Sequence, residues 1–381
     1  MRIGVVCYPT FGGSGVVAVE LGKALSDKGH DIHVITYSQP VRLDFFSANL
    51  AYHEVTIPKY PLFQYVPYET ALTSKVVDVA IHEKLDLLHV HYAIPHASAA
   101  FMAQQILRSK GVNMPFVTTL HGTDITLVGK DPSYEPVVTF AINNSDGVTT
   151  VSESLKRDTY SNFDIKNEIE VIPNFIDLKR FSRKPKEHFK KAIAPNNERI
   201  VVHTSNFRKV KRVQDVVKVF DKVSKEINAK LLLIGDGPER VKIEELCREL
   251  GSCDDIRFLG KQEAIEEILS VCDLFIMPSE TESFGLAALE AMACQVPVIS
   301  SNSGGIPELN QEGFSGYLSK VGDVNDMAQK AISILKDDST LNMFKENALV
   351  QARKFDVNQI MPLYEQYYQK VLAGNSVKVS S

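Results

Sequence analysis

Apolar runs with the length of buried strands alternate with amphipathic, helix-like stretches along almost the whole chain. Alternation of this kind is typical of parallel α/β sheets that helices cover on both faces. A less regular, proline-bearing insertion at about 38–67 interrupts the pattern. In the first half the apolar runs predict strands near residues 2–8, 31–37, 85–91, 115–120, 147–152 and 169–173.

The second half of the chain restarts the same alternation. A charged stretch at 179–199 separates the two halves. We therefore expect two doubly wound sheets, one in a domain 1–173 and one in a domain 174–357. Open α/β sheets bind ligands at the carboxyl ends of their strands, so ligand-binding residues are expected there. The apolar runs of the second half predict strands at 200–203, 231–235, 256–259, 274–277 and 296–299.

The last part of the chain, about 324–372, has the composition of helices, and 373–381 reads as a flexible tail. A length of 381 residues suits two domains of about 150 to 200 residues each.

Charge and cysteine usage narrow the function classes. A net charge of −5 argues against a general role on nucleic acid or on a membrane surface. The five cysteines are scattered without a Cys-x-x-Cys pair, so neither a disulfide framework nor a zinc site is indicated. No stretch has the ~18 consecutive apolar residues of a spanning helix, and the N-terminal apolar run is too short for a signal peptide. We expect a cytoplasmic protein, and its oligomeric state stays open, a homo-oligomer included.

The stretch 279–291 contains the most informative chemistry. It follows an apolar run and reads as strand, loop and helix, with Glu282 on the loop and Glu290 inside the helix. A helix start favours anions, so the amides of 285–287 are candidates for holding a diphosphate, while carboxylates accept hydrogen bonds from sugar hydroxyls. A surface acid plus a solvated helix acid explains the same pattern equally well from spacing alone.

A glycine-rich loop, Gly12 to Gly15, follows the first predicted strand and opens a helix. It fits the dinucleotide fingerprint Gly-x-Gly-x-x-Ala, which would indicate a nicotinamide-dependent oxidoreductase. The preceding loop is long for that turn, however, and the second strand ends at Tyr37 without the acidic residue that would bind a ribose. A loop whose backbone approaches an anionic ligand, or a simple turn, explains the same glycines.

Histidines gather where two predicted strands end. The segment 89–96 contains three, and Tyr92 lies among them; His121 follows the next strand. A metal site is disfavoured because His89 and His91 have no carboxylate or cysteine ligand nearby in sequence. A lone histidine is usually structural, but a strand-end position before Gly and Thr would place His121 at the edge of the sheet where ligands bind.

A basic segment, 205–212, follows the first strand of the second half. Cations near a helix start oppose the helix dipole unless they meet a bound anion, so Arg208 and Lys211 are candidates for a phosphate site; a solvated basic loop is the alternative. The turns at 235–239 and 303–308 read as helix starts. No Asp-x-Asp pair, a common arrangement of carboxylates for Mg²⁺, occurs in the sequence.

Taken together, these motifs resemble the retaining glycosyltransferases of family 4, whose architecture (GT-B) places two Rossmann-like domains around a central cleft. The run Ser-Glu-x-Glu-Ser-Phe-Gly-Leu-x-x-x-Glu-Ala resembles the family's Glu-x7-Glu signature. The resemblance implies an acceptor-binding first domain, on which the last helix (about 358–372) packs, and a second domain that binds the nucleotide sugar. Asn206 stands where the family has Arg, and Arg208 is expected to supply that charge.

The resemblance also assigns roles. Glu290 would bind the ribose, Glu282 the donor sugar, and His121 the region near the reacting carbon. The implied catalytic residues are His121, Glu282 and Lys211. The implied donor-binding residues are Gly13, Asn206, Arg208, Lys211, Glu282, Phe284, Gly285, Leu286 and Glu290. The implied acceptor-binding residues are Gly13, Ser14, Gly15, Lys75, Tyr92 and Thr123, of which Lys75 is the most speculative.

Three stretches, 7–15, 119–126 and 205–215, are most similar to family members that transfer GlcNAc from UDP-GlcNAc to the hydroxyl of L-malate, the first step of bacillithiol biosynthesis. That resemblance implies small-molecule substrates, no cofactor and no metal. Two alternatives stay open: a family 4 enzyme with another acceptor, and a protein that binds a UDP-sugar without catalysis.

Overall fold

A computed structural model describes residues 1–10, 12–43, 49–57, 66–184 and 186–379. The predicted insertion at 38–67, the tail at 373–381 and the charged stretch at 179–199 lie partly outside these residues. The chain forms two compact units. Unit 1 comprises Met1–Asn174 and Asn358–Ser381, and unit 2 comprises Phe175–Val357.

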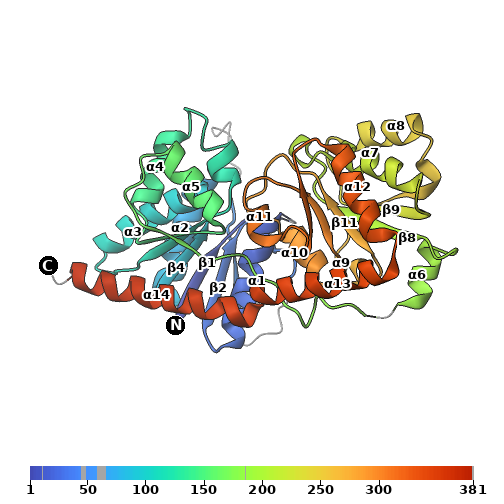
Figure 1. Cartoon of the computed structure of the whole chain (residues 1–381). Helices are drawn as coiled ribbons and strands as arrows, with labels where there is room; N and C mark the ends of the chain where they lie inside the picture. Colours follow the sequence, from blue (N-terminus) through green and yellow to red (C-terminus); the bar gives the residue numbers. More distant parts are fainter. Residues whose placement is uncertain (11, 44–48, 58–65, 185, 380–381) are drawn as a thin grey trace. The chain divides into compact units, whose positions relative to one another are not determined.

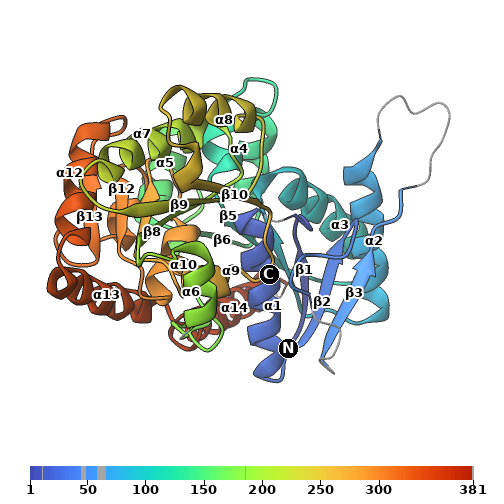
Figure 2. The same ribbon diagram turned by 90° about the vertical axis from the view of Figure 1, so that its right-hand side faces the viewer.

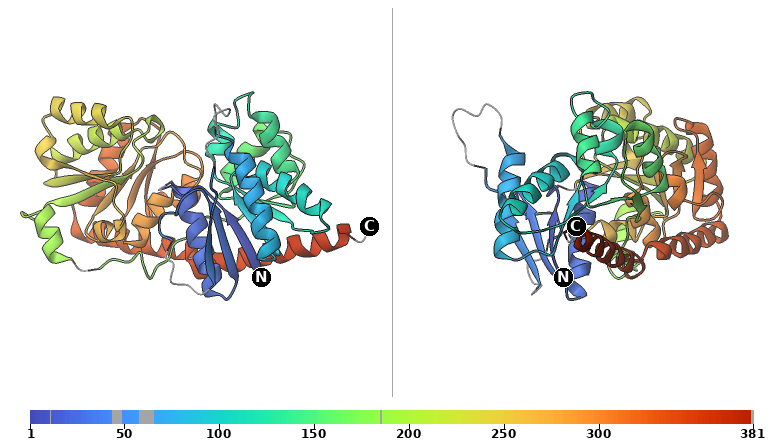
Figure 3. Two further views of the ribbon diagram at one scale, coloured as in Figure 1. Left: turned by 180° about the vertical axis from the view of Figure 1, so that it is seen from behind. Right: turned by 90° about the vertical axis from the view of Figure 1, so that its left-hand side faces the viewer.

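Unit 1 contains a seven-stranded sheet in the order β3-β2-β1-β4-β5-β6-β7, in which every pair of neighbours is parallel (Figure 1). Parallel pairing requires crossovers, and the chain supplies them with helices on both faces of the sheet (Figure 3). The strands are β1 Arg2–Val6, β2 Asp31–Thr36, β3 Leu50–Glu54, β4 Leu87–His91, β5 Phe116–Leu120, β6 Gly147–Thr150 and β7 Ile169–Val171. The helices are α1 Gly13–Asp27, α2 Tyr68–His82, α3 Ser98–Ser109, α4 Glu135–Asn143, α5 Glu153–Asn162 and α14 Val357–Val379.

The last helix, α14, packs on unit 1 through aromatic side chains. The Tyr367 hydroxyl accepts a hydrogen bond from the Val148 amide at 2.8 Å, and the hydroxyl of the fully buried Tyr368 contacts His89 Nδ1 at 2.7 Å. Glu365 binds Lys28 at 2.5 Å. Helix α14 therefore completes the unit to which the first 174 residues belong.

Unit 2 repeats the architecture with a six-stranded parallel sheet in the order β10-β9-β8-β11-β12-β13. The strands are β8 Arg199–Thr204, β9 Ala229–Ile234, β10 Ile256–Gly260, β11 Leu274–Met277, β12 Val298–Ser301 and β13 Gly316–Ser319. The helices are α6 Glu187–Ile193, α7 Val213–Ser224, α8 Arg240–Glu249, α9 Ile265–Leu269, α10 Leu286–Ala293, α11 Ile306–Leu309, α12 Val324–Leu335 and α13 Asp338–Ala352.

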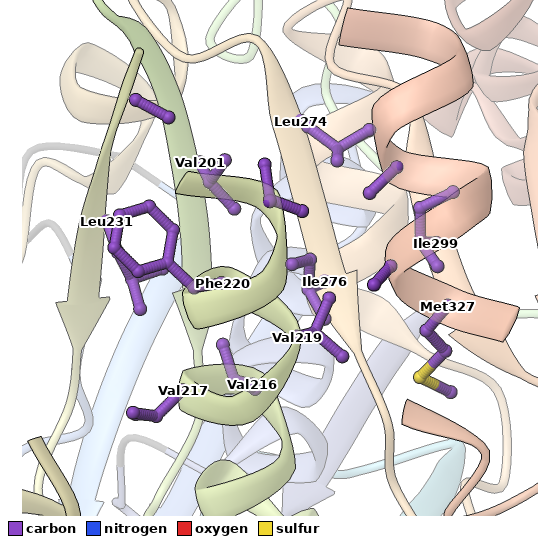
Figure 4. Close-up of a cluster of buried hydrophobic side chains, with 14 of the residues drawn as sticks. Val201, Val216, Val217, Val219, Phe220, Leu231, Leu274, Ile276, Ile299 and Met327 are labelled. Carbon is purple, nitrogen blue, oxygen red and sulfur yellow. The ribbon is translucent and has the colours of Figure 1, made fainter. Parts of the chain in front are cut away.

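One core of unit 2 lies between its sheet and helices α7 and α12. Figure 4 shows Phe220 of α7 beside Val201 and Leu231, two strand residues, and Met327 of α12 near Ile299. These side chains are at most 1% exposed, so each contributes roughly 1.5 to 3 kcal/mol of hydrophobic stabilisation. Burial on both faces explains why the strands of this sheet read as continuous apolar runs.

The two predicted parallel sheets are confirmed, but two edge strands and the last helix end were predicted wrongly. Strand β3 lies inside the insertion that the sequence suggested to be irregular, and β13 was not predicted. Both are short and only partly buried, so they lack a clear apolar run. Helix α14 continues to Val379 instead of ending near 372, since a helix that is already formed adds residues at little cost.

Each sheet has one point where the strand order reverses. In unit 1 it lies between β1 and β4, and in unit 2 between β8 and β11. Loops that leave the carboxyl ends of these two strands diverge to opposite faces, and doubly wound sheets bind ligands in the space between them. The loops after β1, β4, β8 and β11 are therefore the places where each unit is expected to hold a ligand.

Candidate active site

The half-site of unit 2 joins the loops after β8 and β11. Lys211 Nζ lies 2.5 Å from Glu282 Oε1, and the two side chains are 22% and 15% exposed. The pair thus spans the reversal of strand order, with the cation on one loop and the carboxylate on the other. Two predicted catalytic residues that are 71 positions apart in sequence meet here.

Glu282 accepts two hydrogen bonds besides its contact with Lys211. The Ser279 hydroxyl donates a hydrogen bond to its carboxylate at 2.9 Å, and the Gly305 amide donates to its carbonyl at 2.8 Å. Gly304 has a φ of +60°, and a Cβ at this position would lie 2.1 Å from the Glu282 carbonyl oxygen. Only glycine lets the 303–308 loop come this close, so that loop positions the acidic loop.

Helix α10 begins at Leu286, on the far side of the loop that contains Glu282. Gly285 caps it with a left-handed φ of +96° and supplies no side chain that could occupy the first amides. Free amides and the positive end of a helix dipole favour an anion, which is the chemistry that the sequence predicts for this helix start. Glu290 lies one turn inside the helix and is 6% exposed. The Phe284 ring packs on Phe355, so only the backbone of Phe284 is left for a donor.

The cations of the basic segment divide into paired and unpaired groups. Arg212 Nε binds Asp215 at 2.6 Å and its Nη1 binds Glu280 at 3.2 Å, so its charge is already neutralised. Arg208 is exposed, and its guanidinium forms no hydrogen bond or ion pair with any residue in the described part of the chain. Asn206 is also exposed. Arg208 therefore has the availability that the sequence analysis expects of a phosphate ligand.

A buried histidine and a glycine turn hold the loops of this half-site in place, and neither was among the predicted site residues. His203 is fully buried, and its ring nitrogens contact the Ile276 carbonyl at 2.7 Å and the Ser205 hydroxyl at 2.8 Å, linking the ends of β8 and β11. Burial lowers the pKa of His203 to about 4. Gly235 and Gly237 let their turn pack on this loop, since their Cβ atoms would lie 1.8 Å from Ser205 O and 2.2 Å from Asn206 O.

The half-site of unit 1 joins the loops after β1 and β4. The Ser14 hydroxyl donates a hydrogen bond to the Tyr92 hydroxyl at 2.8 Å, across the reversal of strand order. A Cβ on Gly15 would lie 2.4 Å from the Tyr8 carbonyl oxygen, so glycine allows the loop to fold onto the helix start. The Tyr8 ring lies 5.6 Å from that of Tyr92. Ser14 and Tyr92, both predicted to bind the acceptor, therefore meet.

His121 joins this half-site through other histidines. Its Nε2 lies 2.8 Å from Nδ1 of the fully buried His91, and its ring lies 5.4 Å from Tyr92. Burial, followed by the neighbouring His96, lowers the pKa of His121 to about 3. The imidazole is therefore neutral near pH 7, so it can donate or accept a hydrogen bond but carries no charge.

Asp124 organises this corner and was not singled out in the sequence analysis. Its carboxylate accepts hydrogen bonds from the amides of Gly122 at 2.9 Å and Ala93 at 3.0 Å, which ties the loops after β5 and β4 together. Burial raises its pKa to about 6. An Asp two residues after a Gly that follows a strand is a recognisable turn signal, and it could have identified this residue.

The other predicted acceptor ligands are placed differently. Gly13 is the first residue of α1, and Thr123 is exposed on the turn after His121. Lys75 lies on α2, seven residues or about 10 Å of helix beyond Tyr68, and its Nζ is 3.7 Å from Asp78. The structure thus brings Ser14, Tyr92 and His121 together but does not bring Lys75 to them.

Comparisons with known proteins agree with this division. A model of "Glycosyltransferase Family 4" matches residues 11–180, and a model of "Glycosyl transferases group 1" matches residues 184–351. The N-acetyl-alpha-D-glucosaminyl L-malate synthase of Bacillus anthracis is 47% identical over 374 residues, which cover 98% of this chain and 97% of that protein. The D-inositol 3-phosphate glycosyltransferase of Corynebacterium kroppenstedtii is 25% identical over 82% of this chain and 73% of that protein.

Solved structures support the fold. The Anabaena protein HepE in complex with UDP and glucose matches with a TM-score of 0.81 at 21% identity, covering 96% of this chain and 98% of HepE. Sucrose-phosphate synthase from Thermosynechococcus elongatus matches with a TM-score of 0.78 at 23% identity, covering 98% and 100%. In the part of the chain that the structure describes, no helix has the length and apolar composition needed to cross a membrane.

Proposed function

Because the chain belongs to the family 4 glycosyltransferases of GT-B architecture, we propose that it transfers GlcNAc from UDP-GlcNAc to the hydroxyl of L-malate and releases UDP. The observation that carries this proposal is the 47% identity with the L-malate synthase along nearly the full length of both chains. The product, GlcNAc-malate, places the reaction at the start of bacillithiol biosynthesis. Both substrates are polar metabolites of the cell interior, so we place the reaction in the cytoplasm.

Unit 2 holds the donor in this proposal. The Glu290 carboxylate accepts hydrogen bonds from the ribose hydroxyls, while the amides of 285–287 and the free cation of Arg208 bind the diphosphate. Lys211 balances Glu282 in the absence of substrate, and a dianionic phosphate offers it a second partner. Charge that develops on the departing UDP is then stabilised by groups that are already in place, which lowers the barrier more than it strengthens ground-state binding.

Unit 1 holds the acceptor in this proposal. The hydroxyls of Ser14 and Tyr92 and the amides of 13–15 supply donors to the malate carboxylates. The bond from the anomeric carbon of GlcNAc to the β-phosphate oxygen breaks, and a bond from that carbon to the malate hydroxyl oxygen forms. The malate proton passes to the departing phosphate oxygen. The neutral imidazole of His121 contacts the sugar by hydrogen bonding and adds no positive charge beside the oxocarbenium-like centre.

The test is UDP release from UDP-GlcNAc by the purified full chain, with and without L-malate, in the presence of EDTA, with mass spectrometry of the product. Malate-dependent UDP release and the mass of GlcNAc-malate are expected. UDP release with inositol 3-phosphate but not with malate would replace the acceptor. UDP binding without release in either mixture would leave a UDP-sugar-binding protein and refute the proposed catalysis.

A further inference from the structure

A second cluster of polar side chains lies in unit 1 where the end of α2 packs across strands β2 and β3. His33 and His53 belong to β2 and β3, and the strand register pairs His33 with Ala51 and Ile35 with His53. The two histidines are therefore diagonal neighbours on one face of the sheet. Figure 2 shows α2 beside the edge strand β3 and its neighbour β2, and Glu83 directly follows that helix.

The three side chains converge on one point. His33 Nδ1 lies 3.0 Å from His53 Nε2, and the rings stack at 29° with centroids 5.2 Å apart. One ligand atom from each of His33, His53 and Glu83 lies within 4.8 Å of the others. His33 is 4% exposed, His53 is half-buried and Glu83 is exposed. The cluster thus combines a buried ring, a half-buried ring and an exposed carboxylate, so solvent reaches it from the Glu83 side.

This donor set suits a transition metal. Two imidazole nitrogens and a carboxylate are ligands of Zn²⁺ at about 2.0 to 2.2 Å, so two nitrogens on one tetrahedral ion lie roughly 3.3 Å apart. The observed separation of 3.0 Å is close to that value.

An independent observation separates this arrangement from a simple hydrogen bond between two rings. The other nitrogen of His33, Nε2, is buried and has no hydrogen-bond partner among the described residues, but it lies 3.7 Å from Asp31 Oδ1. Histidines that bind a metal through one nitrogen commonly direct the other toward a carboxylate, which fixes the ring and raises its basicity. Asp31 is in that position.

From this geometry we propose that His33, His53 and Glu83 bind one divalent transition-metal ion of the zinc class, with water in the fourth position. The bound ion ties the edge strand β3 to the end of α2. Its role is structural, because Glu83 lies four residues before β4 begins whereas Ser14 and Tyr92 lie where the strands end. The proposal is independent of the glycosyl transfer.

The test uses the untagged full chain, freed of metal with EDTA and dialysed, then titrated with Co²⁺ and with Zn²⁺. We expect one equivalent of Co²⁺ with visible absorption bands of a four-coordinate N/O site, displaced by Zn²⁺. His53→Gln and Glu83→Gln are the informative variants because both side chains are partly exposed, whereas His33 is buried. Each is expected to bind at least about tenfold more weakly.

The matched controls are His188→Gln, which removes an exposed histidine of unit 2, and Cys253→Ser, which removes an exposed thiol. Both are expected to bind like the unsubstituted chain. Zn²⁺ should also slow amide exchange in segments 50–54 and 68–83 of the unsubstituted chain, and not in His53→Gln. Absence of the one-equivalent site, or equal binding by His53→Gln and the unsubstituted chain, would overturn the proposal.

Discussion

Acidification should destabilise unit 1 more than unit 2, because unit 1 contains a group of buried neutral histidines. His89, His91 and His96 have no exposed surface. Burial lowers the pKa of His89 to about 3 and that of His96 to about 4, and it holds the pKa of His91 well below its ordinary value of 6.5. His121, the fourth histidine of this group, is partly exposed.

The sign follows from proton binding. Between pH 6.5 and the folded pKa values the unfolded chain binds protons that the folded chain does not, so stability falls as the pH falls below 6.5. At pH 5 each buried histidine removes about 2 kcal/mol, or about 6 kcal/mol for the three. Burial raises the pKa of Asp124 to about 6, so at pH 5 this carboxyl is protonated in the folded chain but not in the unfolded chain. Its protonation therefore stabilises the folded state by about 1 kcal/mol and offsets part of the loss.

The net loss of about 5 kcal/mol in unit 1 compares with about 2 kcal/mol in unit 2, where His203 is a buried histidine with a pKa of about 4. Domain stabilities are about 5 to 15 kcal/mol, so unit 1 is expected to open first. Hydrogen exchange read by mass spectrometry at pH 7.5, 6 and 5, corrected for intrinsic exchange, resolves strand peptides of each unit. The chain contains no Trp, which makes this readout more specific than fluorescence.

A single substitution tests the cause. His89 contacts the hydroxyls of Tyr368 at 2.7 Å and Thr119 at 2.6 Å, and a Gln side chain can hydrogen-bond with both. His89→Gln should therefore reduce the acid-induced loss in unit 1 by about 2 kcal/mol. If exchange from β4 and β5 changes by less than about 1 kcal/mol between pH 7.5 and 5, or if His89→Gln leaves the loss unchanged, the reasoning is refuted.

Three further predictions concern unit 2. Lys211→Met should lower kcat/KM for UDP-GlcNAc about 100- to 1000-fold in the UDP-release assay, because it removes a cation from the departing phosphate. The control Lys209→Met, the same change two residues earlier, should keep kcat/KM within about threefold of the unsubstituted chain. Glu290→Gln should weaken UDP binding about tenfold or more by titration calorimetry, because charge-assisted hydrogen bonds to the ribose are lost; unchanged affinity would remove Glu290 from the ribose site. Lys345→Met should lower the free energy of unfolding in urea by about 3 to 5 kcal/mol, because the 2% exposed Asp273 carboxylate loses the cation that lies 2.6 Å away. The double variant with Asp273→Asn should recover part of that loss.

The sheets could be predicted from the sequence because most of their strands are buried on both faces. Burial on both faces makes a strand a continuous apolar run, and the run at 274–277 coincides with β11. The edge strands β3 and β13 were not predicted, because they are only partly buried. Leu50–Glu54 is half-exposed along its length and contains His53, so neither an apolar run nor a strict alternation marks it.

Candidate site residues could be predicted from local patterns, but the groups that hold them could not. The pattern of strand, loop and helix around Gly285 predicts a turn just before the helix, and the structure has Gly285 at that position. The contact of His91 with His121, and the close approach of Gly304 to Glu282, join segments that are distant in sequence. No local period or turn signal contains such information, because it arises only when separate loops are brought to one edge of a sheet.

Strand order is the missing step between predicted residues and predicted pairs. Ser14 and Tyr92 are 78 positions apart, and Lys211 and Glu282 are 71 positions apart. In each unit the partners follow the two strands between which the order reverses, β1 and β4 in one and β8 and β11 in the other. The sequence suggested all four residues as separate candidates. The position at which the strand order reverses then determines which of them lie side by side. The same reasoning explains why Lys75 is not among them: it lies in the middle of a crossover helix, about two turns from the nearest loop at the strand ends.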